Sequence, residues 1–179
     1  MNPLLVLVLI AFALAAGPSL AQSQQSYAGL ELRSIKALSE QQIAGLRTGR
    51  GMGLALAAEV NGYPGPVHVL QFADSLDLSD QQRAKMEELI TAMKAEAIPL
   101  GEQLIVQEAD LDKQFANRTI TPASLAVSTG AIGATHAALR RAHLKYHLFT
   151  VEVLTPAQVQ RYAELRGYNR AMHLHGHRE

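Results

Sequence analysis

The chain has 179 residues, no net charge at pH 7, no cysteine and no tryptophan, and only 5% of its residues are aromatic. The lack of cysteine excludes a disulfide framework and lipid attachment at a cysteine. Abundant Ala, Leu, Gln and Glu favour helices over sheets. The sequence has no dense run of Lys or Arg of the kind that indicates a nucleic-acid partner. The composition therefore indicates one modest helical domain.

Residues 1–21 have the features of a secretory signal that is removed from the mature protein. Most of this segment is an apolar run, shorter than the roughly 20 residues needed to span a bilayer. The run ends before the small-x-small site Ser19-Leu20-Ala21, a typical cleavage site. We expect an exported mature protein that begins at Gln22 and has no membrane span. Residues 22–33 are rich in Gln and Ser and are expected to form a flexible leader.

One local pattern, Leu-(Ser/Thr)-x-x-Gln, occurs three times along the chain. In each copy the hydroxyl can accept a hydrogen bond from the amide three residues later, and the glutamine side chain can reach back to the cap amide. The preceding leucine can pack on the first turn as a hydrophobic staple. Each copy therefore predicts a helix start, with structural caps rather than catalytic groups. The copies are Leu38-Ser39-Glu40-Gln41-Gln42, Leu78-Ser79-Asp80-Gln81-Gln82 and Leu154-Thr155-Pro156-Ala157-Gln158.

The first copy predicts a helix from Ser39 to Asn61-Gly62, where glycine and the prolines beyond it stop the helix. Within this stretch small residues recur at every fourth position. Glycine costs about 1 kcal/mol per helical position relative to alanine, so the stripe needs a reason. We expect a smooth helix face that lets another backbone approach closely. The stripe consists of Gly45, Gly49, Gly53 and Ala57.

A short helix is expected from about Pro66 to Leu76, and the second copy then opens a long helix from Ser79 to about Asn117. Apolar residues of the long helix are spaced four and three apart in turn, which is a heptad seam. Pro99 falls inside this helix and should kink it or remove one hydrogen bond. The seam comprises Met86, Ile90, Met93, Ala97, Leu100, Leu104 and Leu111.

Thr121 and Pro122 have the residue types of an N-cap and a first helical position, and they predict a third helix. A fourth, short helix should run from Thr155 to Arg166 and stop at Gly167. We therefore predict an all-α protein built around a long antiparallel helical hairpin with short flanking helices. Apolar residues recur at intervals of seven along the third helix, at Leu125, Ile132, Leu139, Tyr146 and Val153.

Charge is unevenly divided between the two halves of this hairpin. Acids outnumber bases ten to four in residues 67–117, whereas bases outnumber acids eight to three in residues 118–179. We interpret the asymmetry as an acidic helix lying beside a basic one. The alternative is a basic face that receives acidic or unfolded client proteins.

The second and third copies, with the helices between them, resemble the Spy/CpxP family of periplasmic proteins, which is named for its LTxxQ motif. The strongest likeness is His143-Leu144-Lys145-Tyr146-His147 running into Val153-Leu154-Thr155-Pro156-Ala157-Gln158. The resemblance covers roughly residues 68–167, and it implies four helices that usually assemble as a cradle-shaped homodimer. Family members include an ATP-independent chaperone, an adaptor that inhibits a sensor kinase, and metal-responsive sensors.

The resemblance divides the chain after the signal and leader. Residues 34–66 form an N-terminal helical extension, residues 67–167 a Spy/CpxP-like helical domain, and residues 168–179 a His-rich tail. It implies a periplasmic chaperone or envelope-stress adaptor that binds unfolded envelope proteins and needs no cofactor. The alternative is a metal sensor that acts on a membrane signalling partner such as a sensor kinase. No catalytic set of residues stands out, so we do not predict an enzyme.

The candidate metal ligands are the histidines of the third helix. His143 and His147 are one turn apart, a spacing that can hold a single Zn, Ni or Cu ion. His136 lies near the same line but about 10 Å further along, too far to complete that ion's shell within one helix. Sensor members also use a histidine pair in their first helix, and no histidine precedes His68 here. The alternative is that these helix histidines lie at the edge of the apolar seam or face solvent.

The C-terminal tail contains three alternating histidines, His173, His175 and His177. Such a tail can bind cations weakly, or it can be a solvated end with no role.

Overall fold

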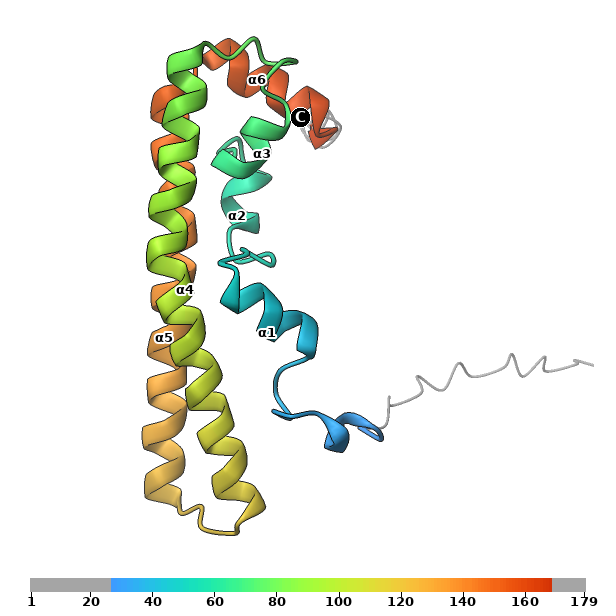
Figure 1. The fold of residues 1–179 in the computed structure, drawn as a ribbon, viewed down its shortest axis with the longest axis vertical. Coiled ribbons are helices and arrows are strands. Elements are labelled where there is room, and N and C mark those ends of the chain that lie inside the picture. The colour runs from blue at the N-terminus through green and yellow to red at the C-terminus, as the bar shows by residue number, and fades with distance from the viewer. Residues whose placement is uncertain (1–26, 169–179) are drawn as a thin grey trace, which may run out of the picture.

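Two long helices, α4 (Asp80–Ala116) and α5 (Pro122–Val153), lie side by side and antiparallel in a computed structural model that describes residues 27–168. Figure 1 shows these two helices along the long axis of the molecule, with the shorter helices beside them and across one end. The all-α hairpin expected from the sequence is confirmed. The predicted signal peptide, the start of the leader and the tail histidines lie outside the described residues.

The capping boxes start the helices where the motifs predict. Ser79 Oγ accepts from the amide of Gln82, and the Gln82 side chain accepts from the amide of Ser79, directly before α4. Thr155 and Gln158 make the same pair of bonds before α6 (Pro156–Leu165). Leu78 and Leu154 are buried in the core, as staple residues should be. A further box, formed by Thr121 and Ser124, precedes α5.

The heptad seams form the inner faces of the hairpin. In the seam of α4, Met86, Met93, Ala97 and Leu104 are buried, and the other members are half-buried. On α5 the central seam residues Ile132, Leu139 and Tyr146 are buried. Helix α4 continues through Pro99, which is exposed, as one helical element. The two methionines therefore serve the core rather than an exposed binding surface.

One ion pair joins the acidic helix to the basic helix within the described residues. Lys145 Nζ lies 2.6 Å from Glu96 Oε1, and Tyr146 donates its hydroxyl proton to the same oxygen at 2.7 Å. These bonds hold the pKa of Glu96 below its ordinary value, with Lys145 as the largest cause. The pair links the two helices at the middle of the hairpin.

The extension does not form the single helix expected from Ser39 to Asn61-Gly62, and that expectation is wrong. The chain forms a short 3-10 turn, η1 (Leu30–Leu32), and two short helices, α1 (Glu40–Arg47) and α2 (Leu56–Glu59), with turns between them. The break has a backbone cause. Gly49 and Gly53 have φ of 66° and 86°, left-handed values that a right-handed helix cannot contain.

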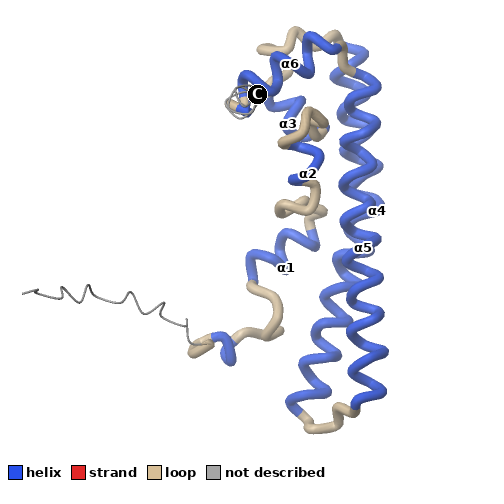
Figure 2. The backbone as a smooth tube through the Cα atoms, turned by 180° about the vertical axis from the view of Figure 1, so that it is seen from behind, coloured by secondary structure: helices blue, strands red, loops and turns tan. Residues whose placement is uncertain are grey.

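The glycine stripe therefore does not exist as a helix face. Gly45 lies in α1, and its missing Cβ makes room for the side chain of Met52. Helix α3 (Pro66–Gln71) also ends earlier than expected and continues as turns to Asp77, which has φ 48°. Figure 2 shows α1, α2 and α3 in succession along one side of the hairpin, with α6 crossing its end near α3.

The core consists of two apolar clusters, which lie at different places along the hairpin. The first joins α3 and α6 to the hairpin and includes Val69, Met86, Tyr146 and Tyr162. The second joins the start of the extension to the middle of the hairpin. Its members are Ile35, Leu38, Ile43, Leu46, Ala97, Leu104, Ile105, Ile132 and Leu139.

Candidate functional site

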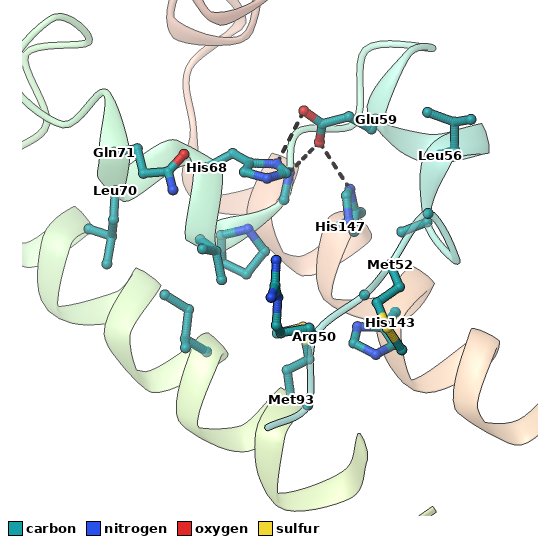
Figure 3. Close-up of a pocket in the computed structure, with 18 of the residues that line it drawn as sticks. Arg50, Met52, Leu56, Glu59, His68, Leu70, Gln71, Met93, His143 and His147 are labelled. Carbon is teal, nitrogen blue, oxygen red and sulfur yellow. Dashed lines mark hydrogen bonds and ion pairs between the residues drawn. The ribbon is translucent and has the colours of Figure 1, made fainter. Parts of the chain in front are cut away.

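A pocket of about 920 Å³ lies between the extension and the hairpin. Three buried polar side chains line it, namely Glu59, His143 and His147. Figure 3 shows these groups together with Arg50, Met52 and Met93, which reach the same space from the glycine-rich turn and from α4. The pocket thus combines apolar walls with a few converging polar groups, the usual composition of a small ligand site.

Glu59 is the polar centre of this region. Its Oε1 accepts hydrogen bonds from the hydroxyls of Tyr162 and Tyr168, and its Oε2 accepts from the amide of Gly65 at 3.2 Å. His68 Nδ1 and Arg166 Nε lie 3.3 and 3.5 Å from Oε1. The carboxylate therefore ties α2 to α3 and to the C-terminal end of α6.

The protonation of Glu59 follows from these neighbours. Burial alone would raise the pKa of its carboxyl, but the close His68 ring and the hydrogen bonds from Tyr162 and Gly65 favour the charged form and hold the pKa at about 2. The same contacts act oppositely on the phenol, because burial and the Glu59 charge raise the pKa of Tyr162. The group is an anchor built from a charged acceptor, two tyrosine hydroxyls, a backbone amide and the nearby Arg166 guanidinium.

Both histidines predicted as ligands line the pocket, one helical turn apart on α5. His147 Nδ1 lies 2.6 Å from the carbonyl oxygen of Tyr63. Because a carbonyl can only accept, Nδ1 of His147 carries a proton and donates it to this oxygen. Burial, and then the neighbouring His147, lower the pKa of His143 below its ordinary value. His143 Nε2 is buried and has no hydrogen-bond partner in the described part of the chain.

His136 is not brought to this pair. It lies on α5 but is exposed and does not line the pocket. Within residues 27–168, no group of three His, Asp or Glu side chains has the arrangement to hold a metal ion. Two imidazoles fit the ligand chemistry of Zn, Ni or Cu, but a third ligand is not supplied by the described residues.

The two motifs that flank the hairpin also bond to each other. Gln82 Nε2 donates to Gln158 Oε1 at 2.9 Å, and Gln158 Nε2 donates to Gln82 Oε1 at 3.1 Å. Each amide nitrogen also donates to a backbone carbonyl, that of Val153 for Gln82 and that of Leu76 for Gln158. Each amide oxygen also accepts from its own cap amide. Both side chains therefore use all of their hydrogen-bonding capacity. We call this pair the glutamine clasp.

The clasp joins the second and third copies of the motif, which lie at opposite ends of the sequence of the hairpin. Residues 68–166, more than half of the chain, match the family described as LTXXQ motif family protein. The chain belongs to the LTXXQ motif family. The resemblance to Spy/CpxP proteins is thereby confirmed. No curated protein and no solved structure matches the chain significantly.

Membership of the LTXXQ family implies a Spy/CpxP-like periplasmic stress protein. Its members are generally non-enzymatic chaperones or adaptors, and the family suggests envelope proteins as partners. None of the helices within residues 27–168 has the length and apolarity needed to cross a membrane. The matched segment contains the hairpin, α6 and both histidines, whereas Glu59 and the glycine-rich turn lie outside it.

Sequence reasoning missed Glu59 and the second role of the glutamines. One signal for Glu59 was present, because it is the only acid between Glu40 and Asp74 and stands in an apolar, glycine-rich stretch. An isolated acid in such a stretch is expected to have a specific partner if it is buried. Its tyrosine partners, Tyr162 on α6 and Tyr168 just after α6, lie 103 and 109 residues away, beyond any local pattern.

Proposed function

We propose that this LTXXQ protein holds unfolded envelope proteins in the periplasm without ATP, as a chaperone or as an envelope-stress adaptor. The observation that supports this most directly is a set of exposed apolar side chains on the half of the hairpin that contains its turn. Val106 and Phe115 in the C-terminal part of α4 are 66% and 54% exposed, and Val127 near the start of α5 is 73% exposed. Unfolded segments offer apolar side chains, and burial of apolar area stabilises such contacts by about 25 cal/mol per Å².

Aggregation of an unfolded client tests this proposal. We expect the mature protein to slow aggregation without nucleotide, and we expect the variant His143→Ala/His147→Ala to retain most of that effect. The reason is that holding depends on extended apolar area rather than on two imidazoles. Light scattering of a chemically unfolded client measures it, with His136→Ala as the matched control because this exposed histidine lies on the same helix. Unhindered aggregation at equimolar wild-type protein would contradict the proposal.

A periplasmic metal sensor is the second candidate, and one observation favours it. The Nε2 atom of His143 is buried, unpartnered and held on a ring whose pKa is lowered, so the neutral ligand form prevails. Calorimetric titration with Zn, Ni and Cu separates the two functions. Submicromolar binding by a chain lacking residues 169–179, lost in the His143→Ala/His147→Ala variant, would favour the sensor and a signalling partner such as a membrane kinase.

We also expect a homodimer. Nearly half of the described residues form two helices with heptad seams, and short flanking elements cover them incompletely, which favours pairing with a second copy. Multi-angle light scattering at micromolar concentration measures the mass directly. A strict monomer over that range would contradict this expectation and would leave the apolar hairpin turn available to clients alone.

A further inference from the structure

The first part of the extension contacts the hairpin almost wholly through aliphatic side chains. We call residues 34–48 the strap. Four strap residues enter the second core cluster, where they meet the middle of α4 and α5. Two precede α1, in non-helical backbone, and two lie three residues apart within α1. They are Ile35, Leu38, Ile43 and Leu46, and each is no more than 7% exposed.

Polar contacts between the strap and the hairpin are confined to its edges. Within the described residues they are two ion pairs, Lys36 with Asp112 and Arg47 with Glu102, both at 3.3 Å. The cations are 50% and 58% exposed, so solvent weakens both pairs. The strap is thus held by non-directional apolar burial, the type of contact by which a chaperone holds clients.

The hairpin has a specific feature that receives the strap. Gly101 lies in the interior of α4, where glycine costs about 1 kcal/mol relative to alanine. A Cβ at this position would lie 2.6 Å from the carbonyl oxygen of Leu46. The glycine therefore allows the backbone of α1 to approach α4 closely. By contrast, a Cβ at Gly133 in α5 would meet nothing within 4 Å.

The two ends of the extension are held by different means. Glu59 anchors one end through its bonds to Tyr162, Tyr168 and Gly65. Between this anchor and the strap lies the turn at residues 49–53, where Gly49, Met52 and Gly53 all have positive φ. Rotation in this turn would let the strap leave the hairpin while the Glu59 anchor stays in place.

We propose that the strap is a built-in occupant of a client surface on the hairpin, which binds a short segment of another unfolded protein once the strap has left. The partner is a peptide segment with aliphatic side chains spaced as in the strap, an extended stretch followed by one to two helical turns. This inference rests on the proposed function, and it adds a second apolar surface for a client, under the strap, and what competes with the client there. The LTXXQ match begins at residue 68, so the surface belongs to the family domain and the strap does not.

The test uses a variant that releases the strap but keeps the surface. Ile43→Asp/Leu46→Asp places two charges against the apolar face and should expose the strap, measured by faster amide exchange at residues 35–48. A fluorescent peptide of residues 33–48 with the natural sequence should then bind the variant at least about tenfold more tightly than wild type, because the tethered strap competes at high effective concentration. The variant should also hold a client more effectively, and an excess of the peptide should reverse this.

Gly101→Ala is an independent variant with a different expected pattern. It should also release the strap, but it should not bind the peptide, because the new methyl group occupies the place of the Leu46 carbonyl. Gly133→Ala is its matched control and should resemble wild type in both measurements. Circular dichroism confirms that each variant retains its helices.

The outcomes separate this inference from the proposed function. If the Asp variant binds no more peptide than wild type, or holds a client no better when wild type holds it, the strap inference is overturned. If no form of the protein holds a client but the peptide binds as expected, the proposed function fails and the strap still covers a peptide-binding surface.

Discussion

Glu59→Gln is expected to lower the free energy of unfolding by about 3 kcal/mol at neutral pH. The reason is that it removes the charge from a buried carboxylate that accepts several hydrogen bonds. Glutamine keeps one acceptor oxygen but turns an NH₂ group toward donors, which include the Tyr162 hydroxyl and the Gly65 amide. Arg166 and His68 would also lose their anionic neighbour. Urea denaturation followed by circular dichroism measures the loss.

Glu96→Gln is the matched control. Glu96 also receives a tyrosine hydroxyl and a cation, but its side chain is 42% exposed. Water can replace its lost contacts, so we expect a loss of no more than about 1 kcal/mol. Equal losses in the two variants would show that the burial of Glu59 is not what makes it important.

The effect of Glu59→Gln should depend on pH in a defined direction. The pKa of Glu59 falls from its ordinary value of 4.5 to about 2 in the folded protein. A lowered pKa stabilises the fold fully above the unfolded pKa, and this contribution is lost as pH falls from about 4.5 to about 2. The difference between wild type and variant should therefore shrink across that window. A difference that stays constant would mean that the folded and unfolded carboxyls titrate alike.

The hairpin could be predicted from sequence because its signals are local. A hydroxyl at Ser79 or Thr155, with glutamine three residues later, specifies two bonds within one helical turn. The seams of α4 and α5 repeat within a heptad, so a partner helix is implied without knowledge of its identity. These signals concern residues at most seven apart, and the structure confirms them.

The extension could not be predicted in the same way. A capping box at Ser39 and small residues at every fourth position are compatible with one helix, and the left-handed φ of Gly49 leaves no mark in the sequence beyond the glycine itself. The strap packs on the middle of the hairpin, whereas the Glu59 anchor bonds to α6 and to the segment after it, so the chain turns between these two contacts. That requirement is set by tertiary contacts, which outweigh local propensity.

The candidate site shows the same division between local and distant information. The spacing of His143 and His147 placed both on one face of α5, but not in a pocket walled by the extension. Their metal-binding role stays a prediction. The glutamines were interpreted as caps, which they are, but their mutual contact joins residues 76 apart in sequence. Only the packed hairpin brings the two motifs together.

The glutamine clasp yields a prediction that separates these two roles. Gln158→Glu keeps an oxygen that accepts from the Thr155 amide, and glutamate serves in capping boxes as well as glutamine. If Gln158 were only a cap, the change would cost almost nothing. In the clasp, however, the carboxylate cannot donate to Leu76 or Gln82, so the Leu76 carbonyl loses its side-chain donor, and Gln82 Oε1 keeps only the Ser79 amide and faces a negative charge. We therefore expect a loss of about 2 kcal/mol.

Gln42→Glu in the first motif is the control for this change. Gln42 forms a capping box with Ser39, and within the described residues its side chain makes no bond to another motif. We expect its replacement to change the free energy of unfolding by less than about 0.5 kcal/mol. A double-mutant cycle of Gln82→Ala and Gln158→Ala, followed by urea denaturation, should give a coupling energy of about 1 to 2 kcal/mol. Additive losses would mean that each glutamine acts only on its own helix, and that the paired motifs of this family stabilise two helix starts independently.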